Sequence, residues 1–167
     1  MKKGFTMIEL IFVIVILGVL ASVAIPRLAA TRDDAEVAKA ATNLTTAVSD
    51  LTAYYTAKGH FKTSAAAATN IADFTKLTNA LDKDGNLNVK GKTTCVQVKL
   101  PPVANNAKAS DKVELTLTFI PGADAVCQQL AKLPGILTMC GQSNTNNASK
   151  ISGDCKIQIG GSGGIQF

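Results

Sequence analysis

The chain has 167 residues, enough for one compact domain and an extension, and a net charge of +5 from 17 Lys and Arg against 12 Asp and Glu. Only 5% of the residues are aromatic, and the mild positive charge is spread along the chain. This composition argues against a nucleic-acid-binding protein, which needs a concentrated basic face.

An apolar run near the N-terminus predicts a membrane-spanning helix. From Leu10 to Ile25, only Gly18 and Ser22 are not apolar. A helix over residues 5–25 has a length of about 31 Å, which matches the hydrocarbon thickness of a bilayer. Lysines at positions 2 and 3 precede the run and favour a cytoplasmic N-terminus, although Arg27 and Arg32 flank its other end.

Glu9 is the unusual residue of this run, because a charged side chain costs on the order of 3 kcal/mol at mid-membrane and less near an end. A secretory signal peptide cleaved near residues 22–24 leaves the acid unexplained, and so does a plain membrane anchor. Cleavage between Gly4 and Phe5 would create an amine four residues before Glu9, able to pair with it within one chain or between staggered chains. Such a pair is worth roughly 4 kcal/mol at an effective dielectric near 20, which offsets the cost of burial.

Residues 2–10 read K-K-G-F-T-x-I-E-L, and an apolar run and Pro26 follow. This combination resembles the leader and N-terminal helix of type IV pilins and pseudopilins of the short-leader class, over about the first thirty residues. The resemblance implies that a membrane-embedded prepilin peptidase removes residues 1–4 and methylates the amine of Phe5. It also implies that Glu9 aligns an incoming subunit with the N-terminus of its neighbour.

Two residues weaken the same helix. Pro26 lacks a backbone donor and clashes with the preceding turn, and Gly18 has a low helix propensity. We expect residues 18–26 to lose helical order when subunits pack into a filament; a gentle kink is the alternative.

Beyond Pro26 the pattern predicts an amphipathic helix over residues 26–57 that ends at Lys58-Gly59. Its expected inner face, with alternating steps of four and three, consists of Val37, Ala41, Leu44, Val48, Leu51 and Tyr55. The spacing allows a coiled coil, but the apolar side chains are small and the strands that follow need a partner. We therefore expect this helix to lie across a sheet.

Residues 58–167 are expected to form a globular α+β head. Residues 59–92 read as a linker region with one short helix, capped by Asn70 and facing inward through Ile71, Phe74, Leu77 or Thr78, and Leu81. The stretch Asp82 to Asn86 predicts a turn. Its alternating Asp and Asn suggest a calcium site as an alternative, but Leu87 and Thr93 stand where an EF-hand needs glycine and glutamate.

The second half predicts an antiparallel pair of strands, joined by residues 103–111, then a short helix and a last strand. Alternating apolar residues mark the strands: Val96, Val98 and Leu100; Val113, Leu115, Leu117 and Phe119; and Cys155, Ile157 and Ile159. The short helix is expected from about residue 123 to Lys132, stopping at Pro134-Gly135. The glycine-rich residues 160–164 do not open a helix, so they are not expected to bind phosphate.

Four cysteines, all in the C-terminal half, form an even set without a C-x-x-C pair or a nearby histidine, which favours disulfides over a zinc site. Three pairings are possible. We favour the pairing of Cys140 with Cys155, because this bond would close the polar loop at residues 141–154 at its base. Cys95 is then left to pair with Cys127. The alternation along the strands does not choose among the pairings.

Nothing in the sequence predicts an enzyme, a cofactor or a metal centre. The single imidazole, His60, lies in a polar loop and is expected to be a solvated surface side chain. No paired-acid motif or phosphate loop stands out, and aromatic residues do not interleave with the lysines, which argues against specific nucleic-acid binding.

The sequence therefore predicts a pilin-like α+β fold: a long N-terminal helix, membrane-embedded in its first half, packed on a small antiparallel sheet with a disulfide-stabilised C-terminal region. The expected function is that of a type IV pilus subunit, serving adhesion, motility or DNA uptake. The subunit would be stored in the inner membrane with its head in the periplasm and then assembled on itself into a surface fibre by inner-membrane machinery. A pseudopilin of a type II secretion system, forming a periplasmic pseudopilus, is one alternative. A membrane-anchored periplasmic binding module that never polymerises is the other.

Overall fold

The computed structural model describes residues 4–64, 67, 69–102, 112–120, 122, 124–141, 151 and 153–161. It divides into two compact units, Met1–Ala35 and Glu36–Phe167. The expected connection at 103–111, most of the polar loop at 141–154, and residues 162–164 of the glycine-rich stretch lie outside the described residues.

The first unit consists of the N-terminal residues and the beginning of α1 (Met7–Lys58), a 52-residue helix. Residues Met7–Ile25 are long and apolar enough to cross a membrane, and none of that stretch is buried. Gly18 and Pro26 both lie within α1 in this single chain.

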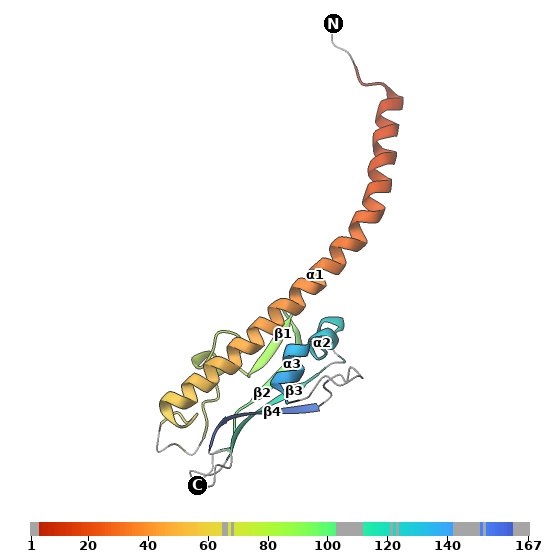
Figure 1. Ribbon diagram of the computed structural model, residues 1–167. Coiled ribbons are helices and arrows are strands. Elements are labelled where there is room, and N and C mark those ends of the chain that lie inside the picture. Colours follow the sequence, from red (N-terminus) through yellow and green to blue (C-terminus); the bar gives the residue numbers. More distant parts are fainter. Residues whose placement is uncertain are drawn as a thin grey trace. The chain divides into compact units, whose positions relative to one another are not determined.

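The second unit contains the rest of α1 and a four-stranded antiparallel sheet (Figure 1). The strands follow chain order, β1 (Asn86–Val89), β2 (Thr93–Lys99), β3 (Val113–Phe119) and β4 (Gly153–Gly160). A 3-10 turn, η1 (Phe74–Lys76), precedes the sheet, and two short helices, α2 (Ala125–Leu130) and α3 (Pro134–Met139), join β3 to β4. The expected α+β class is confirmed.

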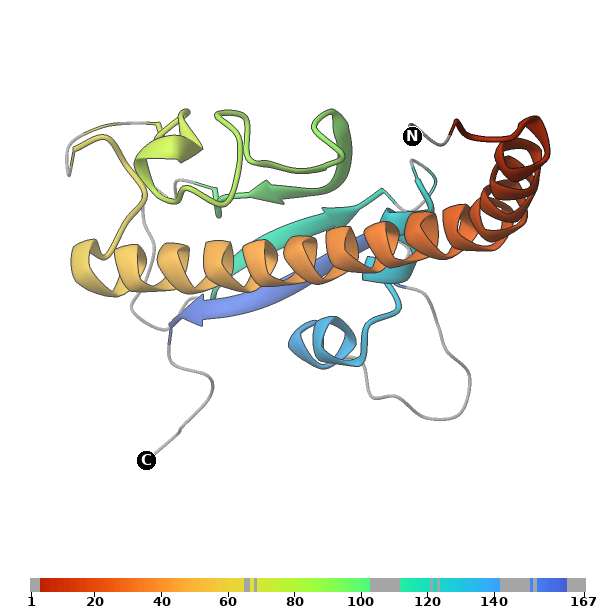
Figure 2. The same cartoon turned by 90° about the horizontal axis from the view of Figure 1, so that it is seen from above.

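The second half of α1 lies across one face of this sheet, as both views show (Figure 1, Figure 2). Its buried apolar residues are Val37, Ala40, Leu44, Ala47 and Leu51. Ala41, Val48 and Tyr55, which the sequence placed on the inner face, flank this line and are only partly buried. The buried face of the helix is therefore rotated from the predicted one, so that Ala40 and Ala47 point to the sheet. Small side chains at these positions let the helix lie close to the sheet. Each leucine buried here contributes about 1.5–3 kcal/mol.

The sheet has one apolar and one polar face, as expected for an antiparallel sheet covered on one side. The register pairs Leu117 with Val98 on one side and with Cys155 on the other. The apolar face is formed by Leu87, Val96, Val98, Leu115, Leu117, Phe119 and Cys155, all of them buried. On the polar face, the Thr118 hydroxyl donates to Asp154 at 2.7 Å, and Lys156 lies 3.9 Å from Glu114.

The helix α1 ends at Lys58, next to the glycine that was predicted to stop it. Gly59 adopts a φ of +73° directly after Lys58, and its N–H donates to the Tyr55 carbonyl at 2.7 Å. Tyr55 also rests on the end of β4, where a Cβ on Gly160 would collide with the tyrosine ring. A glycine at this position therefore allows the helix to lie close to the strand.

Three elements differ from the expectation. The helix expected between residues 70 and 81 is only the turn η1, which Asp73 caps, while Asn70 pairs with Lys62 in an isolated bridge and donates to the Pro101 carbonyl. Of the side chains predicted to face inward, Phe74, Leu77, Thr78 and Leu81 are buried, whereas Ile71 is only partly buried. A segment this short gains its stability from packing and needs no regular helix.

The strand β1 was not predicted, because its four residues alternate too briefly to stand out from the linker region. The helix α3 was not predicted either. Pro134, taken as a stop, is its first residue, a position where the missing N–H of proline has no helical partner to lose. The helix expected up to Lys132 is correspondingly shorter and ends at Leu130.

Candidate functional site at the N-terminus

The start of α1 is closed by a reciprocal pair of hydrogen bonds between Thr6 and Glu9. The Glu9 carboxylate accepts from the Thr6 backbone N–H at 2.9 Å and from the Thr6 hydroxyl at 2.6 Å. In return, the Glu9 backbone N–H donates to the Thr6 hydroxyl at 3.4 Å. This is a capping box, in which the residue before the helix and the third helical residue satisfy each other's free backbone donors.

The capping box changes the account of Glu9. In the single chain the carboxylate is held by Thr6, so it does not stand bare in an apolar segment. Thr6 was not predicted to pair with Glu9, although the spacing T-x-x-E before an apolar run is a recognised helix-start pattern. Gly4 and Phe5 precede the helix, and Phe5 is 83% exposed.

The apolar surface beyond this cap is continuous and uncovered within its unit. Large apolar side chains from Phe5 to Leu28 are exposed, with Leu28 at 68% and Ile25 at 65%. A water-exposed surface of this kind is unfavourable, since each leucine or isoleucine left out of an apolar environment loses about 1.5–3 kcal/mol. The segment therefore needs a bilayer or another apolar helix around it.

The cysteines pair as Cys95–Cys127 and Cys140–Cys155, the pairing that the sequence analysis favoured. The register between β1 and β2 shifts from Leu87 opposite Val96 to Asn88 opposite Thr94, which leaves Cys95 unpaired in a bulge. The bulge explains why Cys95 and Val96 are both buried although they are adjacent in a strand.

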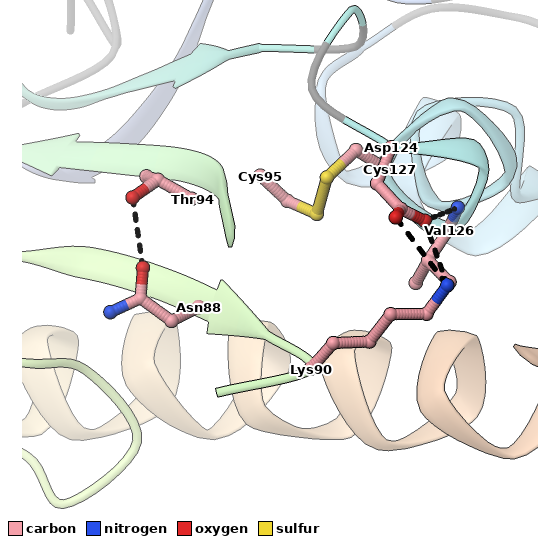
Figure 3. The surroundings of a disulfide bond; sticks show 7 residues. All are labelled: Asn88, Lys90, Thr94, Cys95, Asp124, Val126 and Cys127. Atoms are coloured by element: carbon pink, nitrogen blue, oxygen red, sulfur yellow. Dashed lines mark hydrogen bonds and ion pairs between the residues drawn. A yellow bond between two sulfur atoms is a disulfide. The ribbon is translucent and has the colours of Figure 1, made fainter. Parts of the chain in front are cut away.

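An ion pair lies next to this first disulfide (Figure 3). The Lys90 amine, in the turn between β1 and β2, lies 3.1 Å from the Asp124 carboxylate, and Asp124 also caps α2 by accepting from the Val126 N–H at 2.9 Å. The Val126 N–H and then the Lys90 amine hold the pKa of Asp124 below its usual value. The disulfide and the ion pair together attach α2 to the hairpin.

In the turn that was considered as a calcium site, the Asp82 carboxylate is engaged in hydrogen bonds within the turn. Asp82 accepts from the backbone N–H groups of Asp84 and Asn86 and from the side-chain amides of Asn86 and Asn88, at 2.8–3.1 Å. In the part of the chain that the structure describes, no group of three or more His, Cys, Asp or Glu side chains could hold a metal ion.

His60 differs from its expected state. It is half-buried, and its Nδ1 atom has no hydrogen-bond partner among the residues described.

Residues 1–25 match the model of the prokaryotic N-terminal methylation motif. This motif is typical of the N-terminal segments of type IV pilins and pseudopilins. The motif is the one expected from Gly4, Phe5 and Glu9, and it implies processing by a prepilin peptidase. Among the curated proteins and the solved structures, nothing matches the chain.

Proposed function

We propose that this chain is the structural subunit of a type IV pilus, built by side-by-side packing of the first half of α1. Prepilin peptidase would cut between Gly4 and Phe5 and methylate the new amine of Phe5. The observation that carries the proposal is the coincidence of the methylation motif with an apolar helix of which nothing is buried within its own unit. A helix that is exposed in the single subunit and too apolar for water has two suitable surroundings, the membrane and other copies of itself.

Glu9 would have a polar partner both when the subunit is stored in the membrane and when it is packed in the filament. In the membrane its carboxylate is satisfied by Thr6, as in the single chain. In the filament the methylated amine of a neighbour's Phe5 would take over as the charged partner. The exchange of one partner for another keeps the carboxylate hydrogen-bonded throughout, which avoids the cost of an unpaired charge in apolar surroundings.

The head domain fits a protein that works outside the cytoplasm. Two disulfides clamp the hairpin and the last strand to α2 and α3, and disulfides persist in oxidising compartments. The proposed location is therefore the inner membrane before assembly, with the head in the periplasm, and then the cell surface. The inner-membrane assembly machinery and the protein itself would be its partners, and the role would be structural, without catalysis.

A pseudopilin of a type II secretion system is the second candidate, because the same motif and exposed helix serve both assemblies. The chain length and the disulfide-bearing C-terminal region favour the pilus. Isolation of the protein in sheared surface fibres supports the pilus, whereas a protein restricted to the periplasmic side of the envelope supports the pseudopilus.

The decisive experiment compares two replacements of Glu9. Glu9→Gln keeps a side chain that can complete the capping box but removes the charge, whereas Glu9→Ala removes both. If charge pairing drives assembly, both variants reach the membrane and neither forms fibres. Fibres from Glu9→Gln alone would assign the residue to helix capping, and fibres from both would show that assembly does not depend on Glu9. A protein that reaches the membrane but forms no fibres even when unmodified would support a membrane-anchored binding module. Mass spectrometry of the mature chain, expected to begin at methylated Phe5, is the companion measurement.

A further inference from the structure

A second pair of opposite charges repeats the spacing of the first one further along α1. The amine expected at Phe5 lies four residues before the Glu9 carboxylate, and the Arg32 guanidinium lies four residues before the Glu36 carboxylate. Both pairs place the cation first, and both belong to the same helix or its first residues. Arg32 is exposed and Glu36 is half-buried.

Neither Arg32 nor Glu36 belongs to an ion pair among the residues that the structure describes. The ion pairs within the described residues are those of Lys90 with Asp124 and of Lys156 with Glu114. The order of the charges explains why Arg32 does not pair with Glu36, because a helix favours an acid four residues before a base and not the reverse.

In a helical filament, the four-residue step from Phe5 to Glu9 and the step from Arg32 to Glu36 can be matched by the same shift between neighbouring subunits. All subunits of a filament are related by one screw operation, so a single axial shift applies to every residue. A shift that brings Glu9 of one subunit level with Phe5 of its neighbour spans one four-residue step, about 6 Å. Where α1 is helical and keeps the same tilt to the filament axis, the same shift brings Glu36 level with the neighbour's Arg32.

The apolar surface indicates that neighbours stay in contact up to this point. Exposed large apolar side chains continue through Val23, Ile25 and Leu28, which end one helical turn before Arg32. Covering them requires that helices packed together at Glu9 remain side by side at least as far as Leu28. Arg32 and Glu36 then lie at the polar end of the same helix–helix contact.

We propose that Arg32 of one subunit pairs with Glu36 of the next subunit and fixes the same axial register as the Phe5 amine and Glu9. The occupant of this surface is a second copy of the chain, and the inference rests on the proposed filament function. The pair lies at the edge of the apolar contact, where the surrounding helices exclude part of the water, so it strengthens alignment more than an isolated surface pair does.

The test uses single charge reversals and their combination in one cell. Arg32→Glu and Glu36→Arg each place like charges at every subunit junction, and we expect the fibre yield of each to fall about fivefold or more. Coexpression of the two variants should restore fibres containing both, since in alternating order every junction again joins opposite charges. Lys39→Glu is the matched control: it makes the same change of charge on an exposed residue of α1, but the residue four positions later, Asn43, is uncharged. Its fibre yield should equal that of the unmodified protein.

The coexpression distinguishes a pair of Arg32 and Glu36 between subunits from a pair of the same two residues within one chain. In each single variant, positions 32 and 36 of one chain carry like charges, so a pair within the chain cannot be restored by mixing. If only the double variant Arg32→Glu/Glu36→Arg assembles and the mixture does not, the intersubunit pair is wrong. Normal fibres from Arg32→Glu alone also overturn it and leave the filament function standing. Absence of fibres from the unmodified protein overturns both proposals.

Discussion

At the scale of single residues, glycines with a left-handed backbone show where the fold allows no side chain. Gly85 and Gly91 flank β1 with nearly equal φ angles of +80° and +82°. A Cβ at Gly85 would lie 2.8 Å from the Phe74 ring and from the Val98 carbonyl oxygen, whereas one at Gly91 would meet nothing within 4 Å. Both positions require a positive φ, but only Gly85 is also surrounded by atoms that leave no room for a side chain.

We therefore expect Gly85→Ala to destabilise the fold more than Gly91→Ala. The left-handed conformation costs an alanine about 1–2 kcal/mol at either position, and the collision at Gly85 adds about 1–3 kcal/mol. Urea denaturation followed by circular dichroism measures both, which suits a chain without tryptophan. Equal losses at the two positions would show that the Phe74 ring moves aside freely.

A second residue-scale prediction concerns acid stability at Asp124. Its pKa is lowered in the folded protein by the Val126 N–H and the Lys90 amine. A carboxylate with a lowered folded pKa adds stability above its unfolded pKa of about 3.9, and that contribution disappears as the pH falls through the folded value. Asp124→Asn keeps the helix cap but removes the charge.

We expect Asp124→Asn to melt at a lower temperature than the unmodified protein at pH 7. The difference should shrink toward zero as the pH is lowered from 5 to 2. Thermal melts across this range provide the measurement. A difference that stays constant over the whole range would mean that the charge of Asp124 does not contribute to stability.

At the scale of elements, α1 has to serve two surroundings. Its second half is held by the sheet through Leu44, Leu51 and the contact of Tyr55 with Gly160. Its first half has no such support and contains Gly18 and Pro26. A proline inside a helix costs about 3 kcal/mol and leaves one carbonyl without its helical donor.

We expect residues 18–26 to lose helical order in the assembled fibre, where apolar packing between neighbours can offset the free energy of the lost hydrogen bonds. In the single chain the same residues are helical. A density map of the fibre is the measurement, with Gly18→Ala/Pro26→Ala as the comparison that should remain helical. A continuous α-helix through the stretch in unmodified fibres would contradict the prediction.

At the scale of the whole molecule, the head has a core of its own. Among the residues described, the first buried apolar side chain is Val37, and the core continues through Cys155. Both disulfides lie in the same unit. None of the candidate membrane-spanning stretch Met7–Ile25 is buried.

A chain that begins at residue 30 should therefore be soluble without detergent and form both disulfides. Its melting temperature should lie within about 4 °C of that of the full-length protein in detergent, which corresponds to about 1 kcal/mol. Calorimetry and a non-reducing peptide map check the two parts of the prediction. Aggregation of the truncated chain, or scrambled disulfides, would show that the head depends on the N-terminal segment.

The sequence by itself determined the features that depend on near neighbours in the chain. The apolar run, the junction at Gly4 and Phe5, and Glu9 are all read within the first 25 residues, where the methylation motif matches. The end of α1 at Lys58 and the alternation of β2, β3 and β4 also follow from local patterns. The α+β class followed from these elements together.

Only the tertiary structure decided the features that depend on residues far apart. The bulge at Cys95 turns two adjacent residues inward because β2 must pair with β1 while Cys95 reaches Cys127 in α2. The inner face of α1 is turned toward Ala40 and Ala47 because the sheet, which is assembled from distant segments, sets how closely the helix can approach. The strand β1 and the helix α3 are too short to show a period of their own and exist because the core holds them. Packing between distant segments contributes more free energy than four to six residues of local preference, and for this reason the sequence pattern alone did not reveal them.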